Sequence, residues 1–304
     1  MKKVLVMMGG FSSEREVSLV SGKAVCEALL KKGYDVIEHD LKDTKAFLNV
    51  LYEQKPDVVF NALHGNFGED GEVQGLLDML GIAYTHSGLK ASVLGMNKDL
   101  TKLIAIQNGI NTAAFETMTY HDFLQNGTKI AMPYVVKPAS DGSSVGVFIV
   151  YQKEDLSEVF YQNPDMLLIV EKYISGRELT VSVINDKPCA VTELKPKKGF
   201  YDYRAKYTSG VTDHILPAQL SADIYQKALD NALKMHQLLG CHTVSRSDFR
   251  YNENDGLVFL EVNTNPGMTP LSLVPEQAKF IGMSYEDLCA TLVENATCRK
   301  TGSL

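Results

Sequence analysis

RSDFRYNENDGLVFLEVNTNPGMTPLSLVP, residues 246–275, is the most informative segment of this chain. The strand-like runs TVSRSDF and LVFLEVN flank the turn NENDG, so we expect a hairpin with Asp248 and Glu261 on one face. With Asn263 they offer hard oxygen ligands, which suit Mg²⁺ together with substrate phosphates. The alternative is an exposed hairpin with ordinary charges. A carboxylate after the apolar run LVFL, however, is costly unless it is paired or metal-bound.

Composition bounds the size and the class of the protein. A chain of 304 residues predicts roughly two domains. A hydrophobic content of 45% and a charged content of 22% are ordinary for a globular protein. The net charge of −7 argues against a nucleic-acid-binding protein, which needs a basic face.

Cysteine usage and hydropathy bound the compartment. The five cysteines are scattered and form no CxxC pair, so neither a disulfide framework nor a zinc site is expected. This favours a reduced, cytoplasmic environment. The opening MKKVLVMM has an apolar run too short for a signal peptide, and no run is long enough to span a membrane. A membrane partner is not expected.

The first third of the chain alternates strands and helices. The strand candidates are VLVMM, YDVIEHD, DVVFNAL and GIAYTH, and the helix EREVSLVSGKAVCEALLKKG closes at Gly33. Near-continuous apolar strands between helices predict a parallel, doubly wound sheet. The remainder carries strands around PYVVKPA, VGVFIV, LLIVEKYI, VSVIND and PCAVTEL, with helices at KDLTKLIAIQNG, DLSEVFYQN, SADIYQKALDNALKMHQLLG and SYEDLCATLVENA. We expect an α/β domain at 1–96, and two α+β lobes at 97–180 and 181–304.

A phosphate-binding device is predicted around Lys137. The chain has no GxxxxGK[ST] motif, and the first strand is followed by GGFSSE rather than GxGxxG. Lys137, however, ends the apolar strand YVVK and precedes the loop Ser140–Gly146, whose backbone N–H groups can cover phosphates. A plain hairpin turn is the alternative. A buried lysine there still requires an anion. Lys98 is a second candidate, although a lysine at a helix start is usually solvated.

A nucleoside pocket is predicted from EKYISGRELT, residues 171–180. The apolar run MLLIV leads into Glu171, and a turn at Ser175 and Gly176 separates it from Glu178. A strand edge can meet an adenine, and a glutamate can accept hydrogen bonds from ribose hydroxyls. A simple surface turn is the alternative.

Together these segments resemble the D-alanine–D-alanine ligases of the ATP-grasp superfamily. The resemblance covers nearly the whole chain and is carried by GGFSSEREVSLVSG (9–22), LHGNFGEDGEVQGLL (63–77), MNK (96–98), VVKPASDGSSVGV (135–147), EKYISGRELTV (171–181), FYDYRAKYTSG (200–210) and RSDF with LEVNTNPGMTPLSLVP. It implies an N-terminal doubly wound parallel-sheet domain followed by a two-lobed ATP-grasp module. It also implies ligation of two D-alanine molecules through D-alanyl phosphate, for peptidoglycan synthesis, and a homodimer.

The resemblance assigns roles to residues. It implies two Mg²⁺ ions, with Mn²⁺ as a substitute, on Asp248, Glu261 and Asn263. The expected ATP-binding residues are Lys98, Lys137, Ser144, Glu171, Lys172, Ile174, Glu178 and Lys206. The expected substrate-binding residues are Glu14, His64, Ser272 and Leu273. The expected catalytic residues are the triad Glu14, Ser143 and Tyr207, with Arg246 and the N–H of Gly267 at the oxyanion.

Each role has a plainer alternative from the residues alone. Ser13 and Glu16 fit a helix capping box, which leaves Glu14 an ordinary neighbour. His64 could be a satisfied loop histidine, and Arg246 could pair with Asp248 for structural reasons. At the level of function, the alternatives are a D-alanine–D-lactate ligase and a non-catalytic ATP-grasp regulatory binder. Related D-lactate ligases typically carry histidine where this chain has Tyr207, so tyrosine fits the dipeptide-forming branch.

Overall fold

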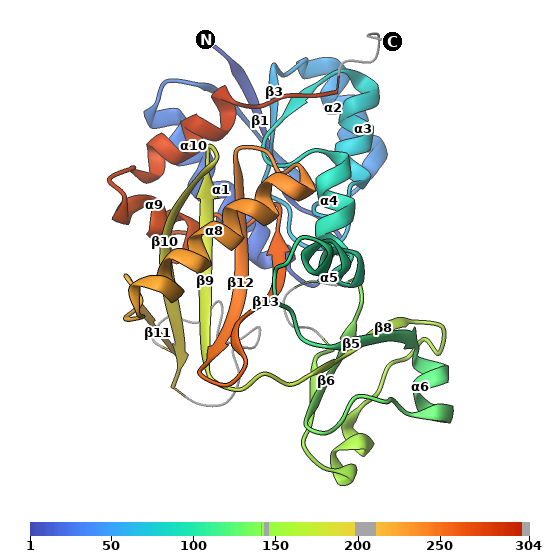
Figure 1. Cartoon of the computed structure of the whole chain (residues 1–304). Helices are drawn as coiled ribbons and strands as arrows, with labels where there is room; N and C mark the ends of the chain where they lie inside the picture. The colour runs from blue at the N-terminus through green and yellow to red at the C-terminus, as the bar shows by residue number, and fades with distance from the viewer. Residues whose placement is uncertain (141, 143–145, 198–210, 300–304) are drawn as a thin grey trace.

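The computed structural model describes residues 1–140, 142, 146–197 and 211–299. It contains one parallel sheet followed by two antiparallel sheets, as Figure 1 shows from the blue N-terminus to the red C-terminus. The predicted combination of an α/β region with α+β lobes is therefore confirmed. Within the described ranges, none of the helices has the length and apolar character needed to cross a membrane.

The N-terminal sheet has apolar cores on both faces. Its strands run in the order β2-β1-β3-β4 and are all parallel: β2 Asp35–Leu41, β1 Lys3–Gly9, β3 Val58–Asn61 and β4 Ala83–Tyr84. Val4 and Val6 of β1 join one core, whereas Leu5 and Met7 join the other. Helix α1 (Arg15–Lys31) covers the first face, and α2 (Thr44–Gln54) with α3 (Glu72–Leu80) covers the second. This two-sided burial is why the strands are apolar without alternation.

The central sheet forms a separate lobe at the lower right of Figure 1. Its antiparallel strands, in spatial order, are β5 Phe115–Thr119, β8 Leu167–Lys172, β6 Tyr134–Pro138 and β7 Phe148–Val150. Helix α6 (Tyr120–Asn126) contributes Tyr120 and Phe123 to the core beneath one face. The other face carries Lys137 and Glu171, because these residues alternate with the core residues Val136 and Val170.

The predicted helix at DLSEVFYQN is wrong. The segment contains only a short 3-10 helix, Lys153–Glu158, and then extended chain. The Asp155 carboxylate accepts the N–H groups of Tyr151 and Gln152, which fixes a turn. Val159 and Tyr161 are buried while Phe160 is exposed. This period-two burial suits β-branched and aromatic residues better than a helix does.

The C-terminal sheet carries the hairpin predicted from residues 246–275. Its antiparallel strands, in spatial order, are β11 Thr212–Ile215, β10 Lys187–Pro196, β9 Arg177–Ile184, β12 Val244–Asn252 and β13 Gly256–Asn263. Helix α8 (Ala222–Leu239) packs on one face. Val181 and Phe249 point into that core, so their neighbours Thr180 and Asp248 lie on the opposite face.

The remaining helices connect the lobes. They are α4 Leu89–Met96, α5 Lys98–Gln107, α9 Leu273–Phe280 and α10 Tyr285–Glu294. Leu288 and Leu292 of α10 complete the core beneath α1, and Thr297 pairs with Tyr84 of β4. The C-terminal segment thus returns to the N-terminal sheet. The division at 96/97 and 180/181 stays a proposal. Because β9 begins at Arg177, we would move the second boundary ahead of that strand.

Candidate active site

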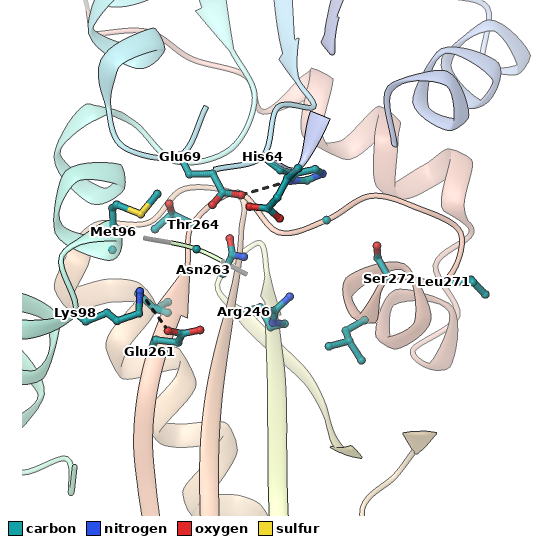
Figure 2. A pocket seen from close by; sticks show the side chains of 16 residues that line it. His64, Glu69, Met96, Lys98, Arg246, Glu261, Asn263, Thr264, Leu271 and Ser272 are labelled. Atoms are coloured by element: carbon teal, nitrogen blue, oxygen red, sulfur yellow. Dashed lines mark hydrogen bonds and ion pairs between the residues drawn. The ribbon is translucent and has the colours of Figure 1, made fainter. Parts of the chain in front are cut away.

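One open pocket brings together residues that are far apart in the sequence, from Glu14 to Leu273 (Figure 2). The open space within it, including the solvent-filled mouth, is about 890 Å³. The predicted site residues that line it are Glu14, His64, Lys98, Arg246, Glu261, Asn263, Gly267, Ser272 and Leu273. The residues come from the loops after β1 and β3, the start of α5, the hairpin and the start of α9.

Glu14 forms part of an acidic corner in this pocket. It lies just before α1 and is 5% exposed. Its N–H donates to Ser12 Oγ at 3.2 Å. Glu14 is itself the N-cap residue of α1, and its side chain makes no cap hydrogen bond, so the capping box predicted for Ser13 and Glu16 is wrong. A Cβ added at Gly65 would lie 3.2 Å from Glu14 Oε2, and one added at Gly142 would lie 3.4 Å away. The carboxylate therefore sits between the two loops that contain these glycines.

His64 and Glu69 complete the corner. His64 Nε2 lies 3.2 Å from Ser21 Oγ, and Nδ1 lies 3.4 Å from Glu69 Oε1. Burial raises the pKa of Glu69, the charge of Glu14 adds to this, and the contact with His64 opposes it. Sequence reasoning missed Glu69, although the spacing from His64 in LHGNFGED was a usable signal. The corner concentrates acidic groups beside a histidine, as a site for an ammonium requires.

The hairpin edge brings the predicted metal ligands together. Asp248 lies directly opposite Glu261, and Arg246 lies opposite Asn263, so the carboxylates share one face of the sheet. Thr180 donates to Asp248 Oδ1 at 2.6 Å. Arg246 holds both oxygens of Asp248, with Nε–Oδ1 at 3.0 Å and Nη2–Oδ2 at 2.9 Å.

This edge fits Mg²⁺. Two carboxylates and an amide give only oxygen ligands, and further ligands would come from phosphate and water. Among the described residues, no group of three or more His, Cys, Asp or Glu side chains could hold a metal. Lys98 Nζ lies 3.7 Å from Glu261 Oε2, which places a cation beside the same edge.

The second predicted lysine, Lys137, lies in a buried ion cluster. Its Nζ is 2.6 Å from Glu171 Oε1, while Glu171 Oε2 is 2.7 Å from Lys102 Nζ. Burial alone would raise the pKa of Glu171, but Lys102 and Lys137 outweigh it and lower that pKa to about 2. The Glu171 side chain is thus committed to ion pairs. Any contact of this residue with an adenine would have to use other atoms. Sequence reasoning did not single out Lys102.

Three further predicted nucleotide residues, Lys172, Ile174 and Glu178, lie beyond this cluster. Glu178 lines a second open pocket of about 1050 Å³, together with Tyr173 and Arg250. Its carboxylate is 3.1 Å from Arg250 Nη2. Ile174 packs in a small apolar cluster, and Lys172, half exposed, pairs with Asp255 at 2.6 Å. These residues surround the connection between β8 of the central sheet and β9 of the C-terminal sheet.

The loop after β13 is fixed from several sides. Asn265 Nδ2 donates to the carbonyl of Leu63 at 2.8 Å, and Tyr285 donates to the carbonyl of Met268 at 2.6 Å. Ser272 is the N-cap residue of α9, and a Cβ added at Gly267 would lie 3.0 Å from its Oγ. The start of α9 therefore borders the pocket, and a helix N-terminus favours a carboxylate.

Four predicted residues lie outside the described residues. They are Ser143, Ser144, Lys206 and Tyr207. Their expected roles, as triad members, loop contact and lid residues, remain proposals.

Comparisons with known proteins agree in one family. The family model for the D-ala D-ala ligase C-terminus matches residues 104–294, and the model for the D-ala D-ala ligase N-terminus matches residues 44–87. A D-alanine–D-alanine ligase from Zymomonas mobilis is 50% identical over 99% of this chain and 95% of its own length.

Solved structures agree as well. A D-alanine–D-alanine ligase from Bacillus anthracis complexed with ATP is 33% identical, with a TM-score of 0.81 over 97% of this chain and 96% of that one. The VanG D-Ala:D-Ser ligase from Enterococcus faecalis is 29% identical, with a TM-score of 0.80 over 96% and 98%. With these matches and the geometry of the pocket, the chain belongs to the D-alanine–D-alanine ligase family.

Proposed function

We propose that this protein uses ATP to join two D-alanine molecules, through D-alanyl phosphate, and releases ADP and phosphate. The product would serve as a peptidoglycan precursor. The observation that carries the proposal is one pocket that is lined by Glu14 in the acidic corner, by Glu261 and by Ser272 at a helix N-terminus, with Asp248 directly opposite Glu261 in the hairpin. Family membership supports the same reaction.

The substrates fit the two ends of the pocket. The ammonium of the first D-alanine would meet Glu14 in the acidic corner, with His64 beside it. The carboxylate of the second D-alanine would meet Ser272 and the N–H of Leu273 at the start of α9. The reacting carbonyl would then lie between the corner and the helix, next to Arg246 and Gly267, which also line the pocket.

Asp248, Glu261 and Asn263 would hold two Mg²⁺ ions, with Mn²⁺ as a substitute. Bound there, the metal would neutralise charge on the phosphates, which phosphoryl transfer needs more than covalent help. Lys98 and Lys137 would add positive charge on the same side, and Ser144 and Lys206 would contact the phosphates from the covering segments. Lys172, Ile174 and Glu178 would surround the nucleoside, near the second pocket.

The second half-reaction needs donors for a developing negative charge. After the amine of the second D-alanine attacks D-alanyl phosphate, Arg246 and the N–H of Gly267 would stabilise the tetrahedral oxyanion. The triad of Glu14, Ser143 and Tyr207 would close the site against water, which otherwise destroys an acyl phosphate.

Phosphate release tests this proposal directly. With ATP and Mg²⁺, we expect rapid release that depends on D-alanine, and much slower release with D-lactate or D-serine as the second substrate. A D-alanine–D-lactate ligase would reverse that preference. A non-catalytic binder would bind ATP without any release above background.

Tyr207 gives a sharper test of substrate choice. We expect Tyr207→His to raise the fraction of D-alanyl-D-lactate formed, and to raise it more as the pH falls. A histidine beside the second substrate would become cationic below about pH 6.5. It would then repel the ammonium group of D-alanine but not the neutral hydroxyl group of D-lactate. Product ratios measured in competition from pH 5.5 to 8.5 check this. A ratio that does not differ from that of the parent would contradict the role of Tyr207, and Tyr207→Phe is the control for loss of the hydroxyl.

We also propose a homodimer in the cytoplasm. Helix α5 exposes three large apolar side chains, Leu100, Leu103 and Ile106, which a second copy could cover. All five cysteines are free thiols, which is the state that a reducing compartment such as the cytoplasm maintains. The mass in solution, measured by light scattering, tests the dimer.

A further inference from the structure

Lys102 has no exposed surface that a nucleotide could contact. The residue is on α5 and is fully buried, with 0% of its surface exposed. Its Nζ lies 2.7 Å from Glu171 Oε2, donates to Thr112 Oγ1 at 2.7 Å and stands 5.7 Å from the centre of the Phe115 ring. A buried ammonium is costly unless it is paired, so its position is set by Glu171.

The charge balance of the cluster depends on Lys102. Glu171 is shared between two ammonium groups, Lys137 at 2.6 Å and Lys102 at 2.7 Å. Within this cluster of three groups, two cations and one anion leave a net charge of about +1 beside Lys137 on β6. Without Lys102, Glu171 and Lys137 would form a neutral pair. Lys137 would then offer a phosphate much less positive potential.

We propose that Lys102 is a positioning residue for ATP. It pairs with Oε2 of Glu171, whereas Lys137 pairs with Oε1, and so it keeps the cluster of these three residues positively charged. This inference rests on the proposed contact between Lys137 and the ATP phosphates. Lys102 does not touch the nucleotide. It acts through Glu171, which it holds from α5, while Glu171 in turn orients Lys137 on the neighbouring strand.

A purely structural role for Lys102 makes a different prediction. The ion pair joins α5 to the central sheet, so its loss could simply loosen the lobe. In that case all ligands of the lobe would weaken together. A role through charge instead affects phosphates and spares the nucleoside. A role through charge also predicts that Mg²⁺-ADP binding recovers when the negative charge of Glu171 is removed together with the positive charge of Lys102.

The experiment compares Lys102→Met with the double variant Lys102→Met, Glu171→Gln. The single variant keeps the Glu171–Lys137 pair, and Thr112 keeps its bond to the Phe259 carbonyl at 2.8 Å, so no buried charge is left unpaired. Binding of Mg²⁺-ADP and of adenosine is measured by calorimetry or ligand-observed NMR. We expect the single variant to bind Mg²⁺-ADP about 10- to 100-fold more weakly. Removal of one unit of positive charge several ångströms from the phosphates has an effect of about this size at an effective dielectric constant of about 20. Adenosine binding should stay within about twofold.

The double variant restores the net charge of about +1 and should regain most of the Mg²⁺-ADP affinity. The KM for D-alanine should stay near the parent value in both variants. Equal weakening of ADP and adenosine, or no rescue in the double variant, would overturn the inference and leave the proposed ligase intact. A parent protein that binds no Mg²⁺-ADP would overturn the proposed ATP site as well.

Discussion

Glu261→Gln is expected to reduce kcat by about 10³-fold or more, because it removes a negative ligand without changing the size of the side chain. Glu261 lies directly opposite Asp248 in the hairpin register, so the two carboxylates supply most of the negative charge at this edge. Glutamine keeps one carbonyl oxygen but cannot offset the charge of a divalent cation. The apparent affinity for Mg²⁺, read from rate against metal concentration, should fall together with kcat.

The matched control lies on the same hairpin. Glu253→Gln makes the same chemical change at the turn, where Glu253 accepts a hydrogen bond from Tyr251 at 2.8 Å. That variant should retain activity within about twofold, since exposed turn substitutions have small effects. If Glu261→Gln kept activity within a few fold of the parent across the magnesium titration, the metal assignment would be wrong.

The shared face of Asp248 and Glu261 was predictable because the information that determines it is local. The turn NENDG and the alternation of LVFLEVN were enough to place Asp248 and Glu261 on one face, and the register agrees. The sequence did not reveal that the register shifts beside this pair, where the partner of Phe249 is Phe259 rather than Leu260. Such a bulge adds one residue to one strand, and the side-chain pattern of that strand alone does not specify it.

Long-range pairs were beyond the reach of sequence patterns. Lys102 looked like one more polar position on the helix KDLTKLIAIQNG, yet it is buried against Glu171 from another lobe. The segment around Glu14 was open to an ordinary capping explanation, but in the structure the Glu14 N–H donates to Ser12 Oγ and the N-terminus of α1 has no side-chain cap hydrogen bond. Both outcomes depend on tertiary packing, which overrides local preference. The roles taken from the family resemblance, rather than from spacing, supplied Glu14, His64 and Ser272.

Substitution of Arg246 is expected to affect the two half-reactions unequally. Arg246→Ala should lower the rate of dipeptide formation by about 10²- to 10³-fold, the usual cost of losing one oxyanion donor. The guanidinium lines the pocket and is held by Asp248 at 3.0 and 2.9 Å, so it is oriented before substrate binds. Because the oxyanion forms only when the second D-alanine attacks, formation of D-alanyl phosphate should suffer less. Trapping with hydroxylamine measures this, since it converts the acyl phosphate to a hydroxamate.

The ratio of hydroxamate to dipeptide should therefore rise in Arg246→Ala at saturating Mg²⁺. Saturating metal is needed because the variant also removes the partner of Asp248. Arg246→Lys is the matched comparison: it keeps the positive charge but loses the two-point hold on the carboxylate, so its rate should lie between those of the parent and Arg246→Ala. If both products fell in the same proportion, Arg246 would be acting through Asp248 and the proposed metal site. The oxyanion would then have to be stabilised by Gly267 without the arginine.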